Sequence, residues 1–366
     1  MSNKGDIKRY SKSPYMKVSY PQDMVISAFD TPFRRKWAVV GIVFFLALPF
    51  IVTPFFVHIA NLIMIACIGA MALNLVTGVA GLLSLGHAGF MCAGAFTVAI
   101  CASRWGMPIW FSIPAAGVVG AFLGLLAGLP SFRLKGLYLG ISTLAMHFII
   151  LYVAREYQFY AGYGHSIKVV DPSIGPFVIS GGKNWYFVLA GFVWLTALFI
   201  TNLLRSRPGR AWIAIRDRDI SARAMGINIG RYKVLAFMVG TAITSIEGGL
   251  YAYYTNMVSA DEYTFYLTVS YIAMIIVGGV GSVLGSIMGA VLITLIPHLL
   301  MYLFGLIDVP IVIKEYFFAI ESGVFGLIII FFILVEPLGL IEIWRRIRVF
   351  FELWPFKYRP LMITKR

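Results

Sequence analysis

Long apolar runs alternate with short polar connections along most of the chain. About 20 helical residues cross the hydrocarbon core of a bilayer, so each run of that length is a candidate membrane-spanning helix. Such runs fall at about 37–57, 59–77, 82–102, 109–130, 137–155, 185–204, 232–254, 265–280, 283–304 and 317–335. The pattern predicts an all-α, polytopic integral membrane protein with about ten transmembrane helices.

Polar sequence brackets the apolar part of the chain. Residues 1–36 are a polar N-terminal extension, 37–335 form the predicted transmembrane domain, and 336–366 form a basic, aromatic tail. Within that tail, 344–360 alternates bases with aromatic residues, which favours a helix that lies at the membrane interface. The polar N-terminus is unlike a cleaved signal peptide.

The composition and the charge agree with this picture. Of 366 residues, 60% are hydrophobic and 13% are charged, whereas soluble domains carry roughly 25% charged residues. With ten spans, 25 of the 30 Lys and Arg residues lie on the side of the N-terminus. Because basic loops are retained in the cytoplasm, we expect both termini to be cytoplasmic. The net charge of +14 then follows from topology and from contact with anionic membrane lipid, and nucleic-acid binding is not needed to explain it.

Two loops are long enough to meet other proteins. The external loop 156–184 is rich in Gly, Pro and aromatic residues, and it either meets a soluble partner or forms an ordered cap. The cytoplasmic loop 205–233 carries eight Lys and Arg residues and interleaves Ile with charges, which predicts a short amphipathic helix ended by Gly226. That helix either lies on the lipid headgroups, as the residues alone favour, or inserts into a groove of a cytosolic motor.

Five blocks carry a family resemblance. They are NLVTGVAGLLSLGHAGFMCAGAF at 74–96, FRLKGLYLGISTLAMHFII at 132–150, GRAWIAIRDRDISARAMGINIGRYKVLAF at 209–237, GGVGSVLGSIMGA at 278–290 and EPLGLIEIW at 336–344. In content and order they resemble the LivM-type permeases of branched-chain amino acid ABC importers. The resemblance covers roughly 61–355 and implies an ABC importer permease fold in a bacterial inner membrane.

The resemblance also implies partners and a docking site. It implies a complex with a LivH-like second permease, two ABC ATPase subunits and a periplasmic substrate-binding protein, in which the 205–233 loop couples the ATPases to the spans. At Ile220 and Ser221 the chain departs from the Glu-Ala-Ala start of the importer pattern. The coupling residues that the resemblance implies are Arg216, Asp217, Asp219, Ala222 and Gly226.

Catalysis is not expected of this chain. The sequence holds no nucleophile elbow, no histidine cluster with metal-ligand spacing and no nucleotide-binding loop. Cys67, Cys92 and Cys101 all fall in predicted spans, which favours packing over a disulfide or a metal site. We therefore expect no cofactor, with ATP bound by the partner subunits.

Glycines at 78, 81, 86 and 89 predict a helix break, because each lowers helix propensity by about 1 kcal/mol relative to Ala. Broken helices at membrane depth line cavities or are buried in protein, and close packing around small residues is the equal alternative. The resemblance places this segment near the translocation path, with Asn74, Ser84 and His87 as candidate polar lining. For His87 alone, a hydrogen-bonded core histidine is the favoured role.

A second glycine series has fourfold spacing. Gly281, Gly285 and Gly289 are not a phosphate loop, because no Lys followed by Ser or Thr closes the pattern. The spacing suits close approach of helices, within this chain or to a second permease.

Two carboxylates, Glu247 and Glu321, fall inside predicted spans, where a charge costs at least about 2.5–3.5 kcal/mol. Each carboxylate either faces the translocation path, where it meets the ammonium of a substrate or gates the path, or it is held inside the bundle in protonated form or lies near a helix end.

Two other functions stay open. One is the same architecture carrying urea, short amides or small organic or aromatic acids, and the other is an ion-coupled carrier that uses both carboxylates as proton sites.

Overall fold

The computed structural model describes residues 45–161, 164, 166–174, 177–179, 181–306, 317–336 and 339–353. The extension 1–36 and the first predicted span up to residue 44 lie outside these residues. The chain divides into two units, 1–57 and 58–366. In the first, the described part is a helix over 45–51 and the start of the next helix; everything below concerns the second unit.

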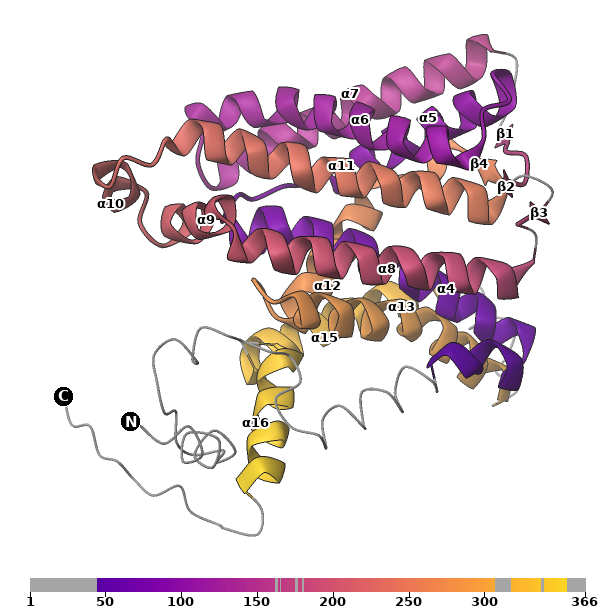
Figure 1. Cartoon of the computed structure of the whole chain (residues 1–366). Coiled ribbons are helices and arrows are strands. Elements are labelled where there is room, and N and C mark those ends of the chain that lie inside the picture. Colours follow the sequence, from indigo (N-terminus) through magenta and orange to yellow (C-terminus); the bar gives the residue numbers. More distant parts are fainter. Residues whose placement is uncertain are drawn as a thin grey trace, which may run out of the picture. The chain divides into compact units, whose positions relative to one another are not determined.

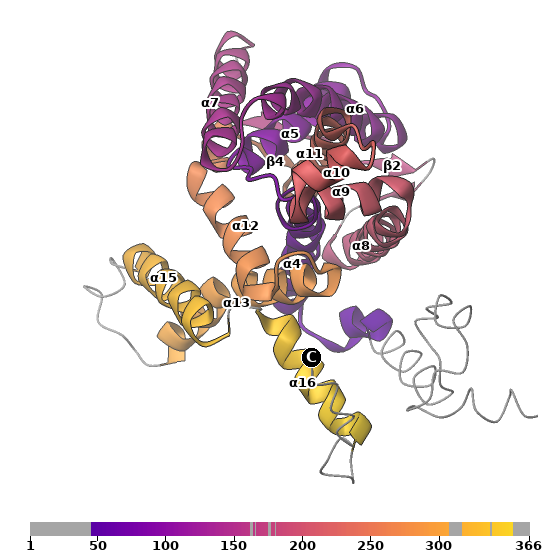
Figure 2. The same cartoon turned by 90° about the vertical axis from the view of Figure 1, so that its left-hand side faces the viewer.

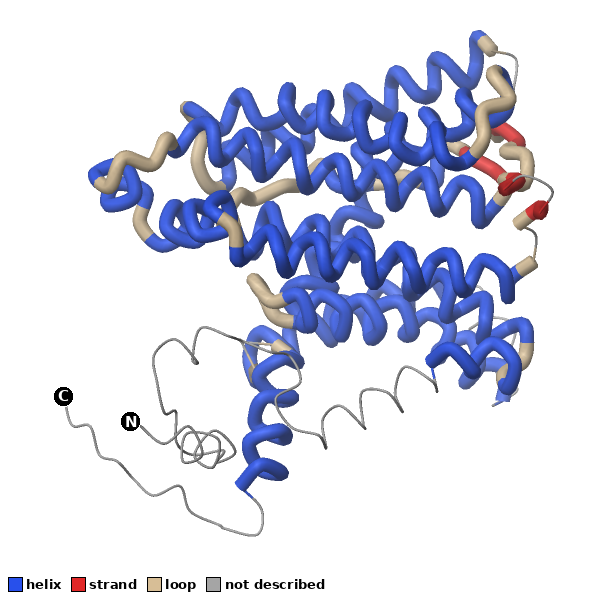
Figure 3. Tube along the Cα trace, viewed as in Figure 1, coloured by secondary structure: helices blue, strands red, loops and turns tan. Residues whose placement is uncertain are grey.

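Helices make up nearly all of the described structure (Figures 1 and 3). They are α4 (Pro54–Asn74), α5 (His87–Arg104), α6 (Ile109–Gly128), α7 (Leu137–Tyr160), α8 (Gly182–Arg205), α9 (Arg207–Asp217), α10 (Asp219–Ala224), α11 (Ile229–Thr255), α12 (Phe265–Gly278), α13 (Val283–Leu306), α15 (Phe317–Val335) and α16 (Leu340–Leu353). Four two-residue strands, β1 (Ile167–Lys168), β2 (Ser173–Ile174), β3 (Phe177–Val178) and β4 (Met257–Val258), form two small antiparallel pairs, β1 with β4 and β2 with β3. The all-α, polytopic prediction is confirmed.

The predicted count of ten full spans is not reached among the described residues. Six helices are long and apolar enough to cross a membrane, and Phe265–Gly278 and Ser322–Phe332 are shorter apolar stretches. With 14 residues, α12 measures about 21 Å, less than the ~30 Å hydrocarbon core. A hydropathy pattern predicts a full span here because it measures the apolar content of the sequence and not the residues at which the helix begins and ends.

Three helices, α5, α6 and α11, pack with their backbones in close contact (Figure 2). A Cβ added to Gly94 of α5 would overlap the Ser245 carbonyl of α11, and one added to Gly248 of α11 would overlap the Met91 carbonyl of α5. Thr241 Oγ1 donates to the Gly120 carbonyl of α6 at 2.8 Å. In lipid, such close approach of small residues is a main source of helix association.

The predicted glycine series 281, 285 and 289 divides between a turn and a packing face. Gly285 and Gly289 of α13 lie against the backbone of α12, where a Cβ on Gly285 would come within 2.8 Å of the Gly278 carbonyl. Gly281 lies instead in the turn between α12 and α13 and has a φ of +87°.

The two ends of the bundle differ (Figure 1). At one end, β1 pairs with β4, and Arg155 Nη2 donates to Asp261 Oδ1 at 2.8 Å, so the described parts of the 156–184 loop join the connection after α11. At the other end lie α9 and α10. The basic residues that charge counting assigns to the outer side, Arg104, Arg155, Lys168 and Lys183, lie at the first end, and Lys314 lies outside the described residues.

The close contact of α5 with α11 gives a stability prediction. Gly248→Ala should lower the free energy of unfolding by about 1–3 kcal/mol, because the backbone of α5 must shift to admit the methyl group. The measurement is the thermal unfolding midpoint of the purified protein in detergent. Gly191→Ala is the matched control, since a Cβ at Gly191 on α8 meets nothing within 4 Å. Equal midpoints for the two variants would contradict the packing argument.

Candidate functional site

The helix break that the glycines predict is present. α4 passes into a π-helix at Leu75–Val79, and residues 80–86 then run without helical structure to the start of α5. The predicted span 82–102 therefore begins at His87. Leu85 N in this segment donates to Thr143 Oγ1 at 2.9 Å, and Ala88 N in the first turn of α5 donates to Thr268 Oγ1 at 3.1 Å. α7 thus holds the segment, and α12 holds the start of α5.

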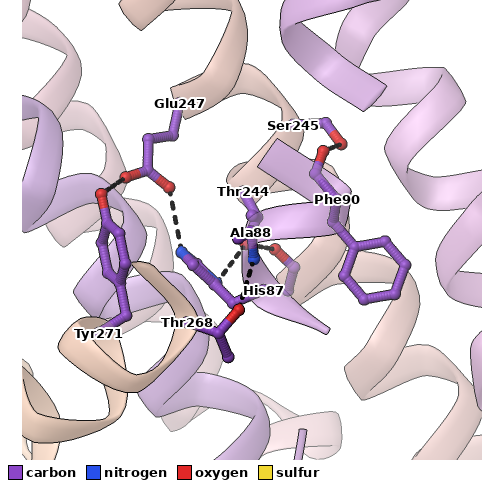
Figure 4. Close-up of polar contacts among 9 residues, drawn as sticks. His87, Ala88, Phe90, Thr244, Ser245, Glu247, Thr268 and Tyr271 are labelled. Atoms are coloured by element: carbon purple, nitrogen blue, oxygen red, sulfur yellow. Dashed lines mark hydrogen bonds and ion pairs between the residues drawn. The ribbon is translucent and has the colours of Figure 1, made fainter. Parts of the chain in front are cut away.

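A buried polar cluster lies where α5 begins (Figure 4). His87, the first residue of α5, places its Nε2 3.4 Å from Oε2 of Glu247 on α11. Tyr271 on α12 donates its hydroxyl to Oε1 of the same carboxylate, and Thr244 Oγ1 lies 3.4 Å from His87 Nδ1. The exposed fractions of His87, Glu247 and Tyr271 are 2%, 0% and 3%. The cluster therefore brings three helices together around one carboxylate.

A fourth helix leaves room for that carboxylate. A Cβ added to Gly69 on α4 would overlap the carboxylate of Glu247. Because a buried charge is costly unless it is paired and hydrogen-bonded, the arrangement of His87, Tyr271 and Gly69 is what permits an ionisable group at this depth.

A cavity of about 270 Å³ borders the cluster. Tyr271 lines it, and residues of α4, α12, α13 and α15 supply mostly apolar walls, among them Ile65, Leu267 and Ile293. Tyr263 and Thr294 also line the cavity, and their buried hydroxyl oxygens have no hydrogen-bond partner among the described residues. Ligand sites combine apolar walls with a few directed polar groups in cavities of roughly 300–1,000 Å³, so this one suits a small solute.

One carboxylate reaches the same cavity from outside the spans. Glu262 closes the short helix Ala260–Glu262 between α11 and α12, and burial raises its pKa. A raised pKa means that this carboxyl holds its proton to a higher pH than an exposed Glu does.

The 205–233 loop folds into two helices, not the single helix predicted. Arg218 adopts an extended conformation, with φ −155° and ψ 105°, and separates α9 from α10. At the end of α10, Gly226 has a φ of +81°, and Ile227 N donates to the Ala222 carbonyl at 3.1 Å. This pattern is a Schellman cap, so the predicted stop at Gly226 is present.

Comparison with known proteins places the chain. Residues 55–333 match the family described as branched-chain amino acid transport system, permease component. The chain belongs to this permease family. It is 32% identical to the high-affinity branched-chain amino acid transport permease LivM of Escherichia coli over 302 residues, 75% of this chain and 71% of the relative. No solved structure matches the chain.

More distant relatives of the permease have varied names. It is 28% identical to a probable LivM of Methanocaldococcus jannaschii over 63% of this chain and 67% of the relative. It is 24% identical to the autoinducer 2 import permease LsrC of an Enterobacter species over 59% of this chain and 62% of the relative.

The candidate path residues of the permease fall in separate places. His87 and Glu247 meet in the cluster. Asn74 lies elsewhere: its Nδ2 donates to Ser282 O at 2.8 Å and to Ser286 Oγ at 2.6 Å, and its Oδ1 accepts from Gly281 N at 2.8 Å, so the amide fastens α4 to α13. Ser84 is buried in the non-helical segment. The side chain of Glu321 lies outside the described residues.

The implied coupling residues also differ in position. Asp217 and Gly226 are exposed, whereas Ala222 is fully buried against Ile215 and Ile229. Asp219 accepts a hydrogen bond from Lys135, which holds the pKa of Asp219 below its usual value. A depressed pKa means that the pair persists at neutral pH and is lost only as the pH falls through that lowered value.

The residues that sequence reasoning missed are Tyr271, Thr244, Gly69 and Tyr263. No local motif marks them, because each matters only through a neighbour on a distant helix. A buried carboxylate requires a donor, and that requirement alone signals that a residue such as Tyr271 exists.

The hydrogen bond from Tyr271 to Glu247 gives the second prediction. Tyr271→Phe should lower the free energy of unfolding by about 1–3 kcal/mol, because it leaves a buried carboxylate oxygen without its donor. Tyr263→Phe is the matched control: Tyr263 is equally buried, and its hydroxyl has no partner among the described residues. Thermal unfolding in detergent measures both, and equal losses would contradict the assigned bond.

Proposed function

We propose that the permease is one membrane-spanning subunit of an ATP-driven importer of branched-chain amino acids in a bacterial inner membrane, with both termini cytoplasmic. It would work with a LivH-like second permease, two ATPase subunits and a periplasmic substrate-binding protein. The observation that carries this proposal is the cavity beside the Glu247 cluster, at a helix break inside a chain similar to named amino acid permeases.

The path in this proposal runs past the cavity. Its apolar walls suit a branched aliphatic side chain, since burial of apolar surface is favourable and needs no directed bond. The hydroxyls of Tyr263 and Thr294 are available to the polar end of the solute, and the Glu262 carboxyl is a candidate partner for its ammonium. With so few directed polar contacts, the solute is bound weakly enough to leave again, as a transport path requires.

The end of the bundle that carries α9 and α10 supports ATP hydrolysis in partner subunits as the energy source. α9 and α10 form a compact projection at the end opposite to the strands, built around Ala222, Ile215 and Ile229. A projection with its own small core behaves as a rigid body, and Asp217 and Gly226 lie on its exposed side. In this proposal the ATPases bind there, and their closure tilts the spans.

Two alternatives share this structure. Another cargo, such as urea, a short amide or a small organic acid, is supported by the relative named for autoinducer 2 import. An ion-coupled carrier is supported by the His87–Glu247 pair, since ionisable residues inside a membrane are typical of proton paths.

One reconstitution separates these functions. The permease is co-expressed with its neighbouring transporter subunits, purified as a complex and placed in vesicles, and uptake of labelled leucine is measured with ATP, with a non-hydrolysable ATP analogue, and with an ion gradient alone. Uptake that needs hydrolysable ATP and is competed by isoleucine and valine supports the proposal. Competition by urea, amides or aromatic acids instead would assign the other cargo, and uptake by the permease alone under an ion gradient would overturn the importer.

Gly226 gives a prediction for coupling. Gly226→Val should lower ATP-driven uptake about tenfold, because a β-branched residue does not adopt a φ of +81° and the end of α10 must rearrange. The amount of inserted protein should stay unchanged. Gly106→Val is the control, with a φ of +59° and nothing within 4 Å at the opposite end of the bundle. If both variants lowered uptake equally, or if neither lowered it, α10 would have no role in the coupling step.

A further inference from the structure

Arg216, on α9, is an exposed residue whose guanidinium contacts the end of the membrane bundle. Its Nη1 donates to the carbonyl of Gly78, in the π-helix that ends α4. A hydrogen bond from a charged donor is roughly twice as strong as one between neutral groups. Arg216 therefore joins the projection to the point where the broken helix leaves its regular structure.

Two further glycine positions lie beside the same side chain. A Cβ on Gly81, which has a φ of +68°, would lie 3.0 Å from Arg216 Cγ, and a Cβ on Gly281 would lie 2.8 Å from Arg216 Nη1. Both positions have a backbone conformation that glycine favours, and a Cβ at either would require the arginine side chain to shift. The arginine side chain thus occupies a gap between residues 78–81 and the α12–α13 turn.

These two segments lead to the polar cluster. From Gly81, the non-helical segment runs directly to His87 at the start of α5. From Gly281, the chain leads back into α12, which carries Tyr271. His87 and Tyr271 are the residues that face the Glu247 carboxylate, so both connections from Arg216 end at the same group.

α9 itself is anchored. Trp212 is fully buried, and its Nε1 donates to the Tyr232 carbonyl at 2.7 Å, at the start of α11. A displacement of α9 about this anchor therefore moves the Arg216 side chain relative to the bundle, because helices with packed cores move as bodies.

We propose that Arg216 is a positioning residue that transmits movement of α9 to the two segments holding His87 and Tyr271 against Glu247. The proposal rests on the function proposed above and differs from the docking role that the resemblance implies for Arg216. A docking residue binds the ATPase; a transmitting residue leaves ATPase binding intact and fails only in transport.

The first test separates these roles in the complete complex. Arg216→Ala should leave the ATPase subunits bound and basal ATP hydrolysis intact, while leucine uptake falls about tenfold or more. Arg216→Lys should recover part of the uptake, since an ammonium can still donate to the Gly78 carbonyl but forms no planar fork. Arg210→Ala is the matched control: on the same helix, Arg210 Nη1 donates at 2.7 Å to the carbonyl of Arg205, the last residue of α8, so this side chain contacts neither residues 78–81 nor the α12–α13 turn.

Three results would overturn the proposal. Loss of the ATPases from the Arg216→Ala complex would make Arg216 a docking residue. Uptake by the Arg216→Ala complex equal to uptake by the Arg210→Ala complex would show that Arg216 has no part in transport. Uptake by the Arg216→Lys complex no higher than by the Arg216→Ala complex would show that the hydrogen bond to the Gly78 carbonyl has no role. Failure of the proposed function is a separate result, because uptake by the unaltered complex would then not depend on ATP.

A second test stands even where Arg216→Ala folds poorly. Gly281→Ala places a methyl group 2.8 Å from Arg216 Nη1 and should lower uptake, whereas Gly106→Ala, also at positive φ but with nothing within 4 Å, should not. In the double variant Arg216→Ala, Gly281→Ala, the crowding is gone, so uptake should be no lower than with Arg216→Ala alone. An additive loss in the double variant would show that Gly281 and Arg216 act independently.

Discussion

The structure depends on one constraint, a carboxylate placed where there is no water to solvate it. Glu247 is fully buried on α11, and an unpaired charge there would be prohibitively costly. Each neighbouring helix is adapted to it: α4 has glycine at 69, α5 begins with a histidine, and α12 supplies a tyrosine hydroxyl. The helix break lies at the same place, since His87, which faces Glu247, is the first residue of α5.

Glycine explains how the bundle meets this demand. At Gly94, Gly248 and Gly285 the missing side chain lets two backbones touch, and at Gly81 and Gly281 it makes room for an arginine. The first set fixes α5 to α11 and α12 to α13 as tight pairs. The second set lies where these pairs meet α9, so the same residue type gives rigidity in one place and access in another.

Much of this could be predicted from the sequence, for reasons visible in particular residues. Apolar runs reveal membrane helices, glycines reveal the break before His87, and Gly226 reveals the end of α10, because each signal is local. The pairing of His87 with Glu247 could not be predicted, since no spacing relates residues on separate helices. The resemblance implies Arg216 only as a coupling residue, and only the fold shows the carbonyl of Gly78 within its reach. The sequence predicts α12 as a full span because its apolar content resembles that of one, although the helix has only 14 residues.

The non-helical segment before His87 affects when water can reach the backbone inside the bundle. The interior of a helix carries its own hydrogen bonds wherever it moves, but this segment and the first turn of α5 use acceptors on other helices, Thr143 on α7 and Thr268 on α12. If either threonine moves away, the abandoned amide needs a water molecule in its place. Separation of these helices is therefore coupled to hydration of the amides of Leu85 and Ala88.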